Sequence, residues 1–204
     1  MARKYEMKRR AERVRETRRR IVEAAIDLHA RVGPAHTTVS AIAERAGVER
    51  QTFYRHFPDE RSINMACSGL YMERNPLPNA DEWRAIEDPR ERLRHGLAEL
   101  YGYYEANEAM FSNVIRDAEF HAITLEMATG HMAAIAELHA ALAEGLARDG
   151  ERRRMDAALQ LALGFHTWRS LVRYSGLSTH EAVELSAASV LAVIGSEGSR
   201  LRST

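Results

Sequence analysis

The sequence predicts an all-α protein, with an N-terminal module of three helices followed by a larger helical bundle. Apolar residues recur with helical periodicity through most of the 204 residues, and no segment of useful length alternates as a strand would. No proline follows Pro89, so long helices meet no interruption in the C-terminal half. Together these observations favour helices throughout the chain.

The composition, 45% hydrophobic and 28% charged, is typical of a globular protein that buries a core. The single cysteine, Cys67, excludes an intramolecular disulfide and a multi-cysteine zinc site. No run approaches the ~18 apolar residues of a membrane helix, and no apolar stretch follows the basic N-terminus as in a secretory signal. We therefore expect a cytoplasmic protein without a membrane partner or a cofactor.

Residues 1–20 contain ten Lys or Arg against three Glu, a net charge of +7, whereas the whole chain has a net charge of zero. A basic segment on an acidic body indicates a polyanionic partner reached from one end. A solvated, disordered tail would show the same composition. We expect residues 1–16 to form a flexible basic arm.

The first helix is expected to end at Gly33-Pro34, because Gly follows and Pro lies beyond many helix ends. Its apolar face carries Ile21, Ala24, Ala25, Leu28 and Val32.

Between residues 38 and 57, Gly47 separates two short helices. Thr38 is suited to cap the first helix, and Gly47 to adopt the left-handed conformation of a tight turn. Phe53 and Phe57, four residues apart, turn one face of the second helix inward. This pattern predicts a helix-turn-helix, whose second helix enters the major groove of DNA. Donors suited to base edges and phosphates remain on its other faces: Arg50, Gln51, Thr52, Tyr54, Arg55 and His56.

A helix over residues 59–74 is expected next, and it ends at the Pro-rich loop 75–79, a seam in the chain. Further helices are expected where apolar stripes recur. They carry Leu93, Leu97, Leu100, Tyr101 and Tyr104; Met110, Val114 and Ile115; and Met132, Ile135, Leu138, Leu142 and Leu146, the last stripe closed by Asp149-Gly150.

The last two helices are expected over residues 152–175 and 179–195, with Gly176 between them. The first is apolar on more than one face, and the second alternates small residues with larger aliphatics. Such helices are buried on several sides, which favours a self-complementary twofold dimer interface. Two central helices of a monomeric bundle would show the same pattern. The expected interface residues are Leu171, Leu185, Ala188, Ser189 and Ala192.

Residues 17–72 closely resemble the DNA-binding region of the tetracycline-repressor (TetR) family. The resemblance lies in Ala24-Ala25, Leu28 and Gly33, in TVSAIAERAGV over 38–48 and in TFYRHF over 52–57. The rest of the chain agrees with the family in length and helical character. The resemblance implies a helix-turn-helix DNA-binding domain over 17–61 and a helical effector-binding and dimerisation domain over 62–204, with 59–74 as the linker helix.

The resemblance also implies roles for single residues. Thr38 would contact a phosphate, and Gln51 and Thr52 would lie near the edge of the major groove. Tyr54 and His56 would hold the DNA backbone. The remaining arginines expected to contact DNA are Arg50 and Arg55, with Arg18 and Arg19 beside the basic arm.

Two positions depart from the family pattern. Glu49 stands where a small capping residue is common, and Glu60 where the family often has a lysine that contacts phosphate. A carboxylate would repel that phosphate. We expect Arg61 or the basic arm to compensate.

The resemblance places an effector pocket among the large residues of the central helices, although core packing explains most of them equally well. His121, His131, His139 and His166 do not match a zinc signature such as HExxH, so we expect no metal site. The expected ligand-binding residues are Tyr101, Tyr104, Phe111, Ile115, Phe120, Phe165 and Trp168.

These features together predict a homodimeric regulator that binds a near-palindromic operator in double-stranded DNA. We expect a repressor that a small apolar or amphipathic effector releases from DNA. A DNA-binding scaffold or packaging protein without an effector is an alternative. A helical-bundle enzyme is less favoured, because no paired Glu-x-x-His motif, phosphate-binding loop or nucleophile elbow occurs. The effector, the operator sequence, the regulated genes and the number of dimers per operator are not legible in the sequence.

Overall fold

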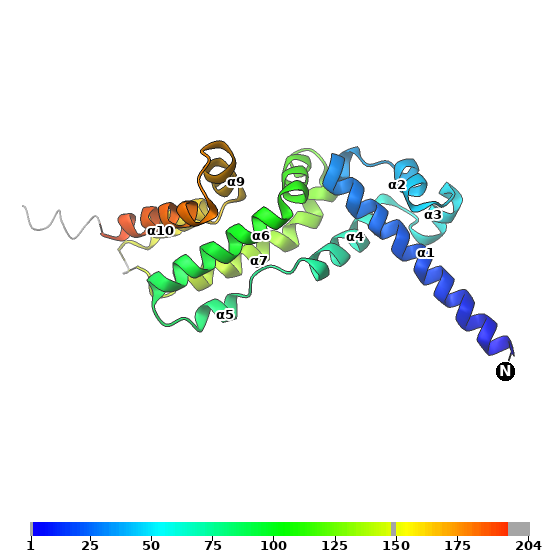
Figure 1. The fold of residues 1–204 in the computed structure, drawn as a ribbon, viewed down its shortest axis with the longest axis horizontal. Coiled ribbons are helices and arrows are strands. Elements are labelled where there is room, and N and C mark those ends of the chain that lie inside the picture. Colours follow the sequence, from blue (N-terminus) through cyan, green and yellow to red (C-terminus); the bar gives the residue numbers. More distant parts are fainter. Residues whose placement is uncertain (1, 148–149, 196–204) are drawn as a thin grey trace, which may run out of the picture. The chain divides into compact units, whose positions relative to one another are not determined.

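The computed structural model describes residues 2–147 and 150–195, and all regular structure among them is helical (Figure 1). The all-α prediction is confirmed. The chain divides into two compact units. Unit 1 consists of Met1–Pro76 and Ala109–Gly130, and unit 2 of Leu77–Glu108 and His131–Thr204. Helices α6 (Pro89–Ala118) and α7 (Ala122–Ala143) contribute residues to both units.

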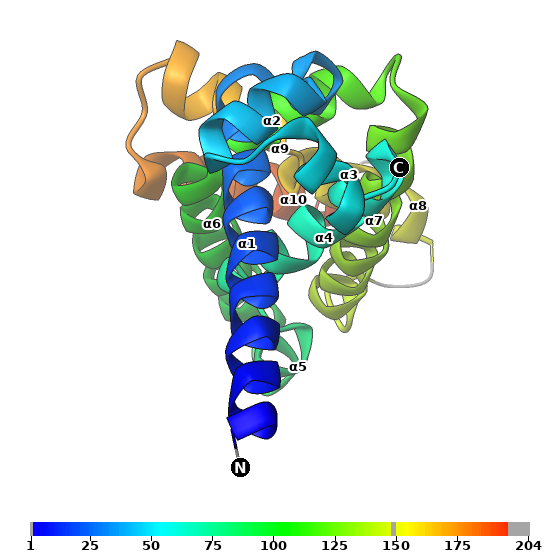
Figure 2. The same ribbon diagram turned by 90° about the vertical axis from the view of Figure 1, so that its right-hand side faces the viewer.

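Unit 1 begins with the longest helix described, α1, which ends where the sequence predicts. Gly33 follows it with φ 98°, a backbone conformation that side chains other than glycine rarely adopt. In the arm expected over residues 1–16, residues 2–16 are helical and form the N-terminal half of α1, which projects beyond α2 and α3 (Figure 2), and residue 1 lies outside the described residues. No Gly or Pro precedes Gly33, and Arg, Lys, Glu and Ala favour helix. The helices are α1 (Ala2–Val32), α2 (Val39–Ala46), α3 (Arg50–His56) and α4 (Glu60–Arg74), with a 3₁₀ turn at Pro34–His36.

The core of unit 1 lies where α1 packs against α2 and α4. The expected inward faces are confirmed at Ile21, Ala24 and Ala25 of α1 and at Phe53 of α3, which are buried. The prediction for Val32, expected on the same face of α1, is wrong: it is the last residue of the helix and is 44% exposed. Val48, just after the turn, packs partly buried against this core. The buried core residues are Ile21, Val22, Ala24, Ala25, Ile42, Ala43, Ala46, Phe53, Phe57, Ile63 and Cys67.

A buried histidine and cysteine join α1 to α4. The Sγ atom of Cys67 lies 3.4 Å from Nδ1 of His29, and both residues are 4% exposed. Burial lowers the pKa of His29 from 6.5 to about 4, because the charged imidazole loses its hydration; nearby Asp117 opposes this shift. Burial also raises the pKa of Cys67 to about 12, so this thiol stays protonated and unreactive at neutral pH.

Unit 2 is built on the α6 stripe, whose five predicted residues, from Leu93 to Tyr104, are all buried. Gly96 permits close packing there, since a Cβ atom would lie 2.8 Å from the Leu142 side chain and 3.0 Å from that of Trp83. The two stripes expected around residues 93–104 and 110–115 belong to one helix. The other helices are α5 (Ala80–Arg84), α8 (Arg152–Ala162), α9 (Phe165–Arg169) and α10 (Thr179–Gly195), with a π-helical turn at Ser170–Tyr174.

The prediction of a single helix over residues 152–175 is wrong, because the helix is interrupted at Leu163-Gly164 and α9 follows the interruption. Gly164 is extended, with ψ 132°. Hydroxyls from α6 occupy the carbonyls freed by the break: Tyr101 donates to the Ala162 oxygen at 2.9 Å, and Tyr104 to the Leu163 oxygen at 2.7 Å. These partners are about 60 residues away, so no local pattern reveals the break.

The helix expected to continue to Asp149-Gly150 ends earlier, at Ala143, and Gly145 follows with φ 74°. Met132, predicted for its inward stripe, is 63% exposed, whereas Leu138 and Leu142 are buried. Asp149 lies outside the described residues.

Helices α8 and α10 pack against each other and leave apolar side chains exposed. Leu161 on α8 is 69% exposed and Leu185 on α10 is 48% exposed. Among the residues expected in a dimer interface, Leu171 is partly buried, and the rest lie on the exposed face of α10: Leu185, Ala188, Ser189 and Ala192.

We expect His29 to make the protein less stable in acid. The pKa of His29 is lower in the folded state than in the unfolded state. Its contribution to the free energy of unfolding is therefore complete above about pH 6.5 and is lost as pH falls toward 4. At about 1.36 kcal/mol per pKa unit, the free energy of unfolding should fall by about 2 kcal/mol between pH 6.5 and 5. Denaturant unfolding at both pH values should show this loss in the wild type and much less of it in His29→Gln. The exposed control His180→Gln should behave as wild type, and an unchanged pH dependence in His29→Gln would contradict the assignment.

Candidate nucleic-acid interface

Two local features set the angle between α2 and α3. The Thr38 side chain accepts a hydrogen bond from the Ala41 N–H at 3.1 Å, so it caps α2 as predicted. Gly47 adopts the left-handed conformation at φ 64° and ψ 43°, and the Val48 N–H then donates to the Ala43 oxygen at 2.9 Å. Backbone hydrogen bonds therefore close the turn, and α3 leaves it in a fixed direction.

Burial of one face of α3 decides which side chains point outward. Phe53 is 0% exposed, and Phe57, just past the end of α3, is 1% exposed. Their rings lie 5.9 Å apart. Tyr54 is 44% exposed and packs its ring edge-on against Phe53. The other predicted DNA-binding residues of α3 are exposed, namely Arg50, Gln51 and Arg55, or partly buried, namely Thr52 and His56.

Arginines of α1 stabilise the arrangement of α2 and α3. The Arg18 guanidinium lies 4.5 Å from the centre of the Phe57 ring, a cation–π contact. Arg20 donates to the Ala46 oxygen at 3.1 Å and so satisfies the C-terminal end of α2. Arg19 forms ion pairs with two glutamates of its own helix, at 3.1 and 3.7 Å. Arg18 and Arg19, expected to contact DNA, thus each have a partner within unit 1.

The position of Glu60 explains one departure from the family pattern. Its carboxylate accepts from His121 Nε2 at 3.1 Å, and the neighbouring Arg61 pairs with Glu126. Both partners belong to the beginning of α7 or the turn before it, so the start of α4 is joined to this region by the Glu60–His121 contact and by one ion pair. Arg61 is 61% exposed despite its partner. Its contact with a phosphate, expected from the sequence, would require the pair with Glu126 to open.

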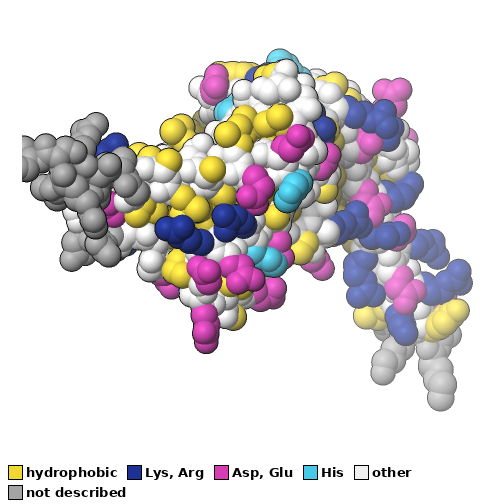
Figure 3. Space-filling view, turned by 60° about the vertical axis from the view of Figure 1, so that its left-hand side comes forward, with side chains coloured by type: hydrophobic (Ala, Val, Ile, Leu, Met, Phe, Trp, Pro, Cys, Tyr) yellow, Lys and Arg dark blue, Asp and Glu magenta, His cyan; other side chains and the backbone are white. Residues whose placement is uncertain are grey.

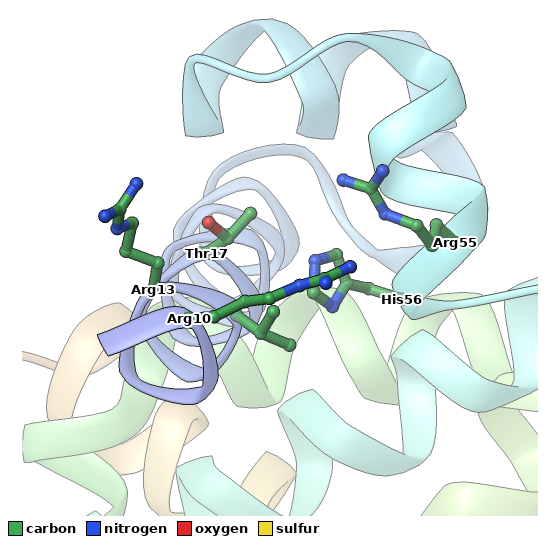
Figure 4. A pocket seen from close by; sticks show the side chains of 6 residues that line it. Arg10, Arg13, Thr17, Arg55 and His56 are labelled. Atoms are coloured by element: carbon green, nitrogen blue, oxygen red, sulfur yellow. The ribbon is translucent and has the colours of Figure 1, made fainter. Parts of the chain in front are cut away.

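A basic hollow of about 390 Å³ lies between α1 and the end of α3 (Figure 4). Figure 3 shows the Lys and Arg side chains along the projecting part of α1. Arg10 and Arg13 were not among the site residues expected from the sequence. Helical periodicity in the sequence could have identified them, because they lie on the same face of α1 as the residues that are buried further along the helix. The lining residues are Arg10, Arg13, Val14, Thr17, Arg55 and His56.

Four of the expected ligand-binding residues belong to unit 2. Phe165 lies 5.5 Å from the Tyr104 ring and 5.4 Å from the Trp168 ring. The hydroxyls of Tyr101 and Tyr104 donate to the backbone at the break before α9, so both residues also have a structural role. Trp168 is fully buried, and its Nε1 has no hydrogen-bond partner within residues 2–147 and 150–195.

The other three expected ligand-binding residues belong to unit 1. Phe111 and Ile115 are partly buried on α6. Phe120 is 64% exposed, with its ring 6.2 Å from that of His36.

In the described part of the chain, no three His, Cys, Asp or Glu side chains are grouped so that they could bind a metal ion. No helix there combines the length and the apolar character needed to cross a bilayer.

The matched family model covers the region of the helix-turn-helix. Residues 21–63 match the family described as bacterial regulatory proteins, tetR family. The match begins in the core half of α1 and ends early in α4. The projecting part of α1, with Arg10 and Arg13, lies outside it.

Several relatives and solved structures that resemble the chain are named as regulators. The HTH-type transcriptional regulator YerO of Bacillus subtilis is 24% identical over 184 residues, which cover 84% of this chain but only 61% of that protein. The HTH-type transcriptional regulator TtgR of Pseudomonas putida is 27% identical over 157 residues, 75% of each chain. The fold resembles that of NalD, the secondary repressor of the MexAB-OprM multidrug efflux pump in Pseudomonas aeruginosa. That match has a TM-score of 0.61, 20% identity, and covers 90% of this chain and 98% of NalD.

We expect Glu126→Gln to strengthen binding to DNA, because it releases Arg61 to contact a phosphate. Fluorescence anisotropy with a 30-base-pair duplex of arbitrary sequence should show tighter binding, and the slope of log affinity against log salt should steepen by about 0.9 per protomer. Glu119→Gln removes the same charge from an exposed residue of unit 1 and is the control. Equal effects of the two variants would mean that only net charge matters.

We expect the two tryptophans of unit 2 to respond differently to replacement by phenylalanine. Trp83 Nε1 donates to the Glu99 carboxylate at 2.6 Å, whereas Trp168 Nε1 has no partner among the described residues. Both changes remove similar volume from fully buried sites. Trp83→Phe should therefore lower the free energy of unfolding by about 1.5–3 kcal/mol more than Trp168→Phe, since a hydrogen bond to a charged group is lost only there. Equal losses in urea unfolding would show that the Trp168 N–H is also satisfied.

Proposed function

We propose that this chain is a sequence-specific transcriptional repressor, because its residues 21–63 match the tetR family of bacterial regulatory proteins. It acts in the bacterial cytoplasm as a homodimer on a near-palindromic operator, and a small apolar or amphipathic effector releases it from DNA. The observation that carries this proposal is the orientation of α3: its aromatic face is buried in the core, and its hydrogen-bond donors face outward.

The outward side chains suit base recognition as well as backbone contact. Arg50 and Arg55 can each form two hydrogen bonds to guanine, and Gln51 can do the same with adenine. Thr38 at the start of α2 and Tyr54 on α3 are exposed and suited to phosphates. A helix that only completed a core would not need donors at each of these positions.

The exposed face of α10 supports the dimer. Leu185, Ala188 and Ala192 lie on it, and small residues allow two helices to approach closely. A twofold axis at this face would relate two DNA-reading helices, and a homodimer reads two half-sites about 34 Å apart along the duplex. The operator should accordingly be a near-palindrome.

The aromatic cluster of unit 2 supports an effector site. Tyr104, Phe165 and Trp168 pack together, and the Arg173 guanidinium lies 5.1 Å from the centre of the Trp168 ring. Burial without a hydrogen-bond partner among the described residues makes the Trp168 N–H an available donor for a ligand with an acceptor group. An apolar molecule with a polar group fits this combination. Binding of effector and of DNA would then weaken each other reciprocally.

We expect the purified chain to enrich one or a few near-palindromic fragments from the genome of its source organism at moderate salt. Arg50→Ala/Arg55→Ala should abolish the enrichment, because those side chains read bases. Sequencing of the recovered fragments measures both. Enrichment that the double variant retains would contradict recognition by α3.

A scaffold or packaging protein would give a different result in the same assay. It would recover fragments without preference, and deletion of residues 2–16 would abolish all binding. A regulator without those residues should keep its preference and lose affinity. Turnover of a small molecule by unit 2 would instead favour an enzyme.

A further inference from the structure

The projecting part of α1 is not needed for the core of unit 1. The first buried residue of α1 is Ile21, and every described residue from Tyr5 to Glu16 is exposed. At 1.5 Å per residue, residues 2–16 extend the helix by about 22 Å. A helix of this length without a core to cover requires another explanation.

Helical geometry places four of the lining residues on one face of α1. At 100° per residue, Arg10, Arg13, Val14 and Thr17 fall on the same side, and Ile21 continues it into the core. The face of α1 that packs against α2 and α4 thus becomes basic N-terminal to the core, where it lies beside the end of α3. Lys8 and Arg15 lie on the opposite face.

The hollow is electrostatically suited to an anion. Three guanidinium groups and one imidazole line it, and none of the described residues that line it carries a carboxylate. In the part of the chain that the structure describes, no ion pair involves Arg10, Arg13 or Arg55, whereas Arg19 is paired. Burial lowers the pKa of His56 most, and the positive charges of Arg55 and Arg18 lower it further.

Its shape and chemistry favour a phosphate. Guanidinium groups donate two parallel hydrogen bonds to phosphate oxygens, and the Thr17 hydroxyl adds a donor. Figure 4 shows Arg55 from α3 and Arg10 from α1 directed toward the same space beside His56. Arg10 and Arg13 are exposed, which suits a phosphate within an extended polymer better than an enclosed small ion.

We propose that this hollow binds a backbone phosphate of duplex DNA, so that the projecting part of α1 is a second DNA-binding element beside α3. This inference rests on the proposed function in that it requires DNA as the partner. Arg55 belongs to both elements: it lies on the outward face of α3 and lines the hollow. The contact adds affinity without reading sequence.

The test compares Arg10→Ala/Arg13→Ala with Lys8→Ala/Arg15→Ala in the full chain. Both variants remove two positive charges from the same exposed helix, and alanine preserves helix formation, which circular dichroism checks. Anisotropy with a 30-base-pair duplex of arbitrary sequence gives the salt dependence of binding. The first variant should lower the slope of log affinity against log salt by about 0.9 per protomer. Between 50 and 200 mM NaCl, the affinity of the wild type should then fall about 3.5-fold more, per protomer, than the affinity of this variant. The second should keep the wild-type slope.

Equal slopes for the two variants, or no binding of the wild type to this duplex, would overturn the proposal. The result does not depend on sequence selection, so it is separate from the genomic experiment above. Loss of selection with a retained difference between the variants would reject the repressor and keep the phosphate site.

The pKa of His56 distinguishes a DNA phosphate bound in the hollow from a free anion. A phosphate beside the imidazole favours the charged form, so the duplex should raise the pKa of His56 in an NMR titration of the full chain, and Arg10→Ala/Arg13→Ala should prevent the rise. Inorganic phosphate at 1 mM is the comparison. A rise as large as that caused by the duplex would assign the hollow to a free anion and overturn its assignment to DNA. No rise with the duplex would overturn it as well.

Discussion

Burial of Phe53 and Phe57 is the constraint on which the DNA-binding surface depends. Fully burying a side chain of this size contributes about 1.5–3 kcal/mol, so α3 cannot rotate about its axis without exposing these rings. The same burial therefore sets the outward direction of Arg50, Gln51 and Arg55. Arg18, placed over the Phe57 ring, extends the constraint to α1.

Helix α1 uses one continuous face for two purposes. Around Ile21, Ala24 and Ala25 this face is apolar and forms the core with α2 and α4. Toward the N-terminus the same face carries Arg10 and Arg13 beside the basic hollow. Because a helix is rigid over this length, packing of the core half also determines where the basic half lies relative to α3 within unit 1.

Polar contacts that are distant in sequence join the remaining helices of each unit. Glu60 with His121 and Arg61 with Glu126 join α4 to the start of α7. In unit 2, the hydroxyls of Tyr101 and Tyr104 satisfy carbonyls at the end of α8. Three of the side chains in these contacts, Arg61, Tyr101 and Tyr104, are expected from the sequence to contact DNA or ligand, and those assignments remain predictions.

The sequence by itself determined the helices whose ends are encoded locally. Thr38 and Gly47 delimit α2, Gly33-Pro34 ends α1, and the spacing of Phe53 and Phe57 orients α3, because caps, left-handed turns and periodic burial all act within a few residues. Only the tertiary structure decided the break at Gly164, the partner of Arg61 and the hollow beside Arg10. Each of these depends on groups brought together from distant parts of the chain, and no local pattern records which carbonyl a distant hydroxyl will satisfy.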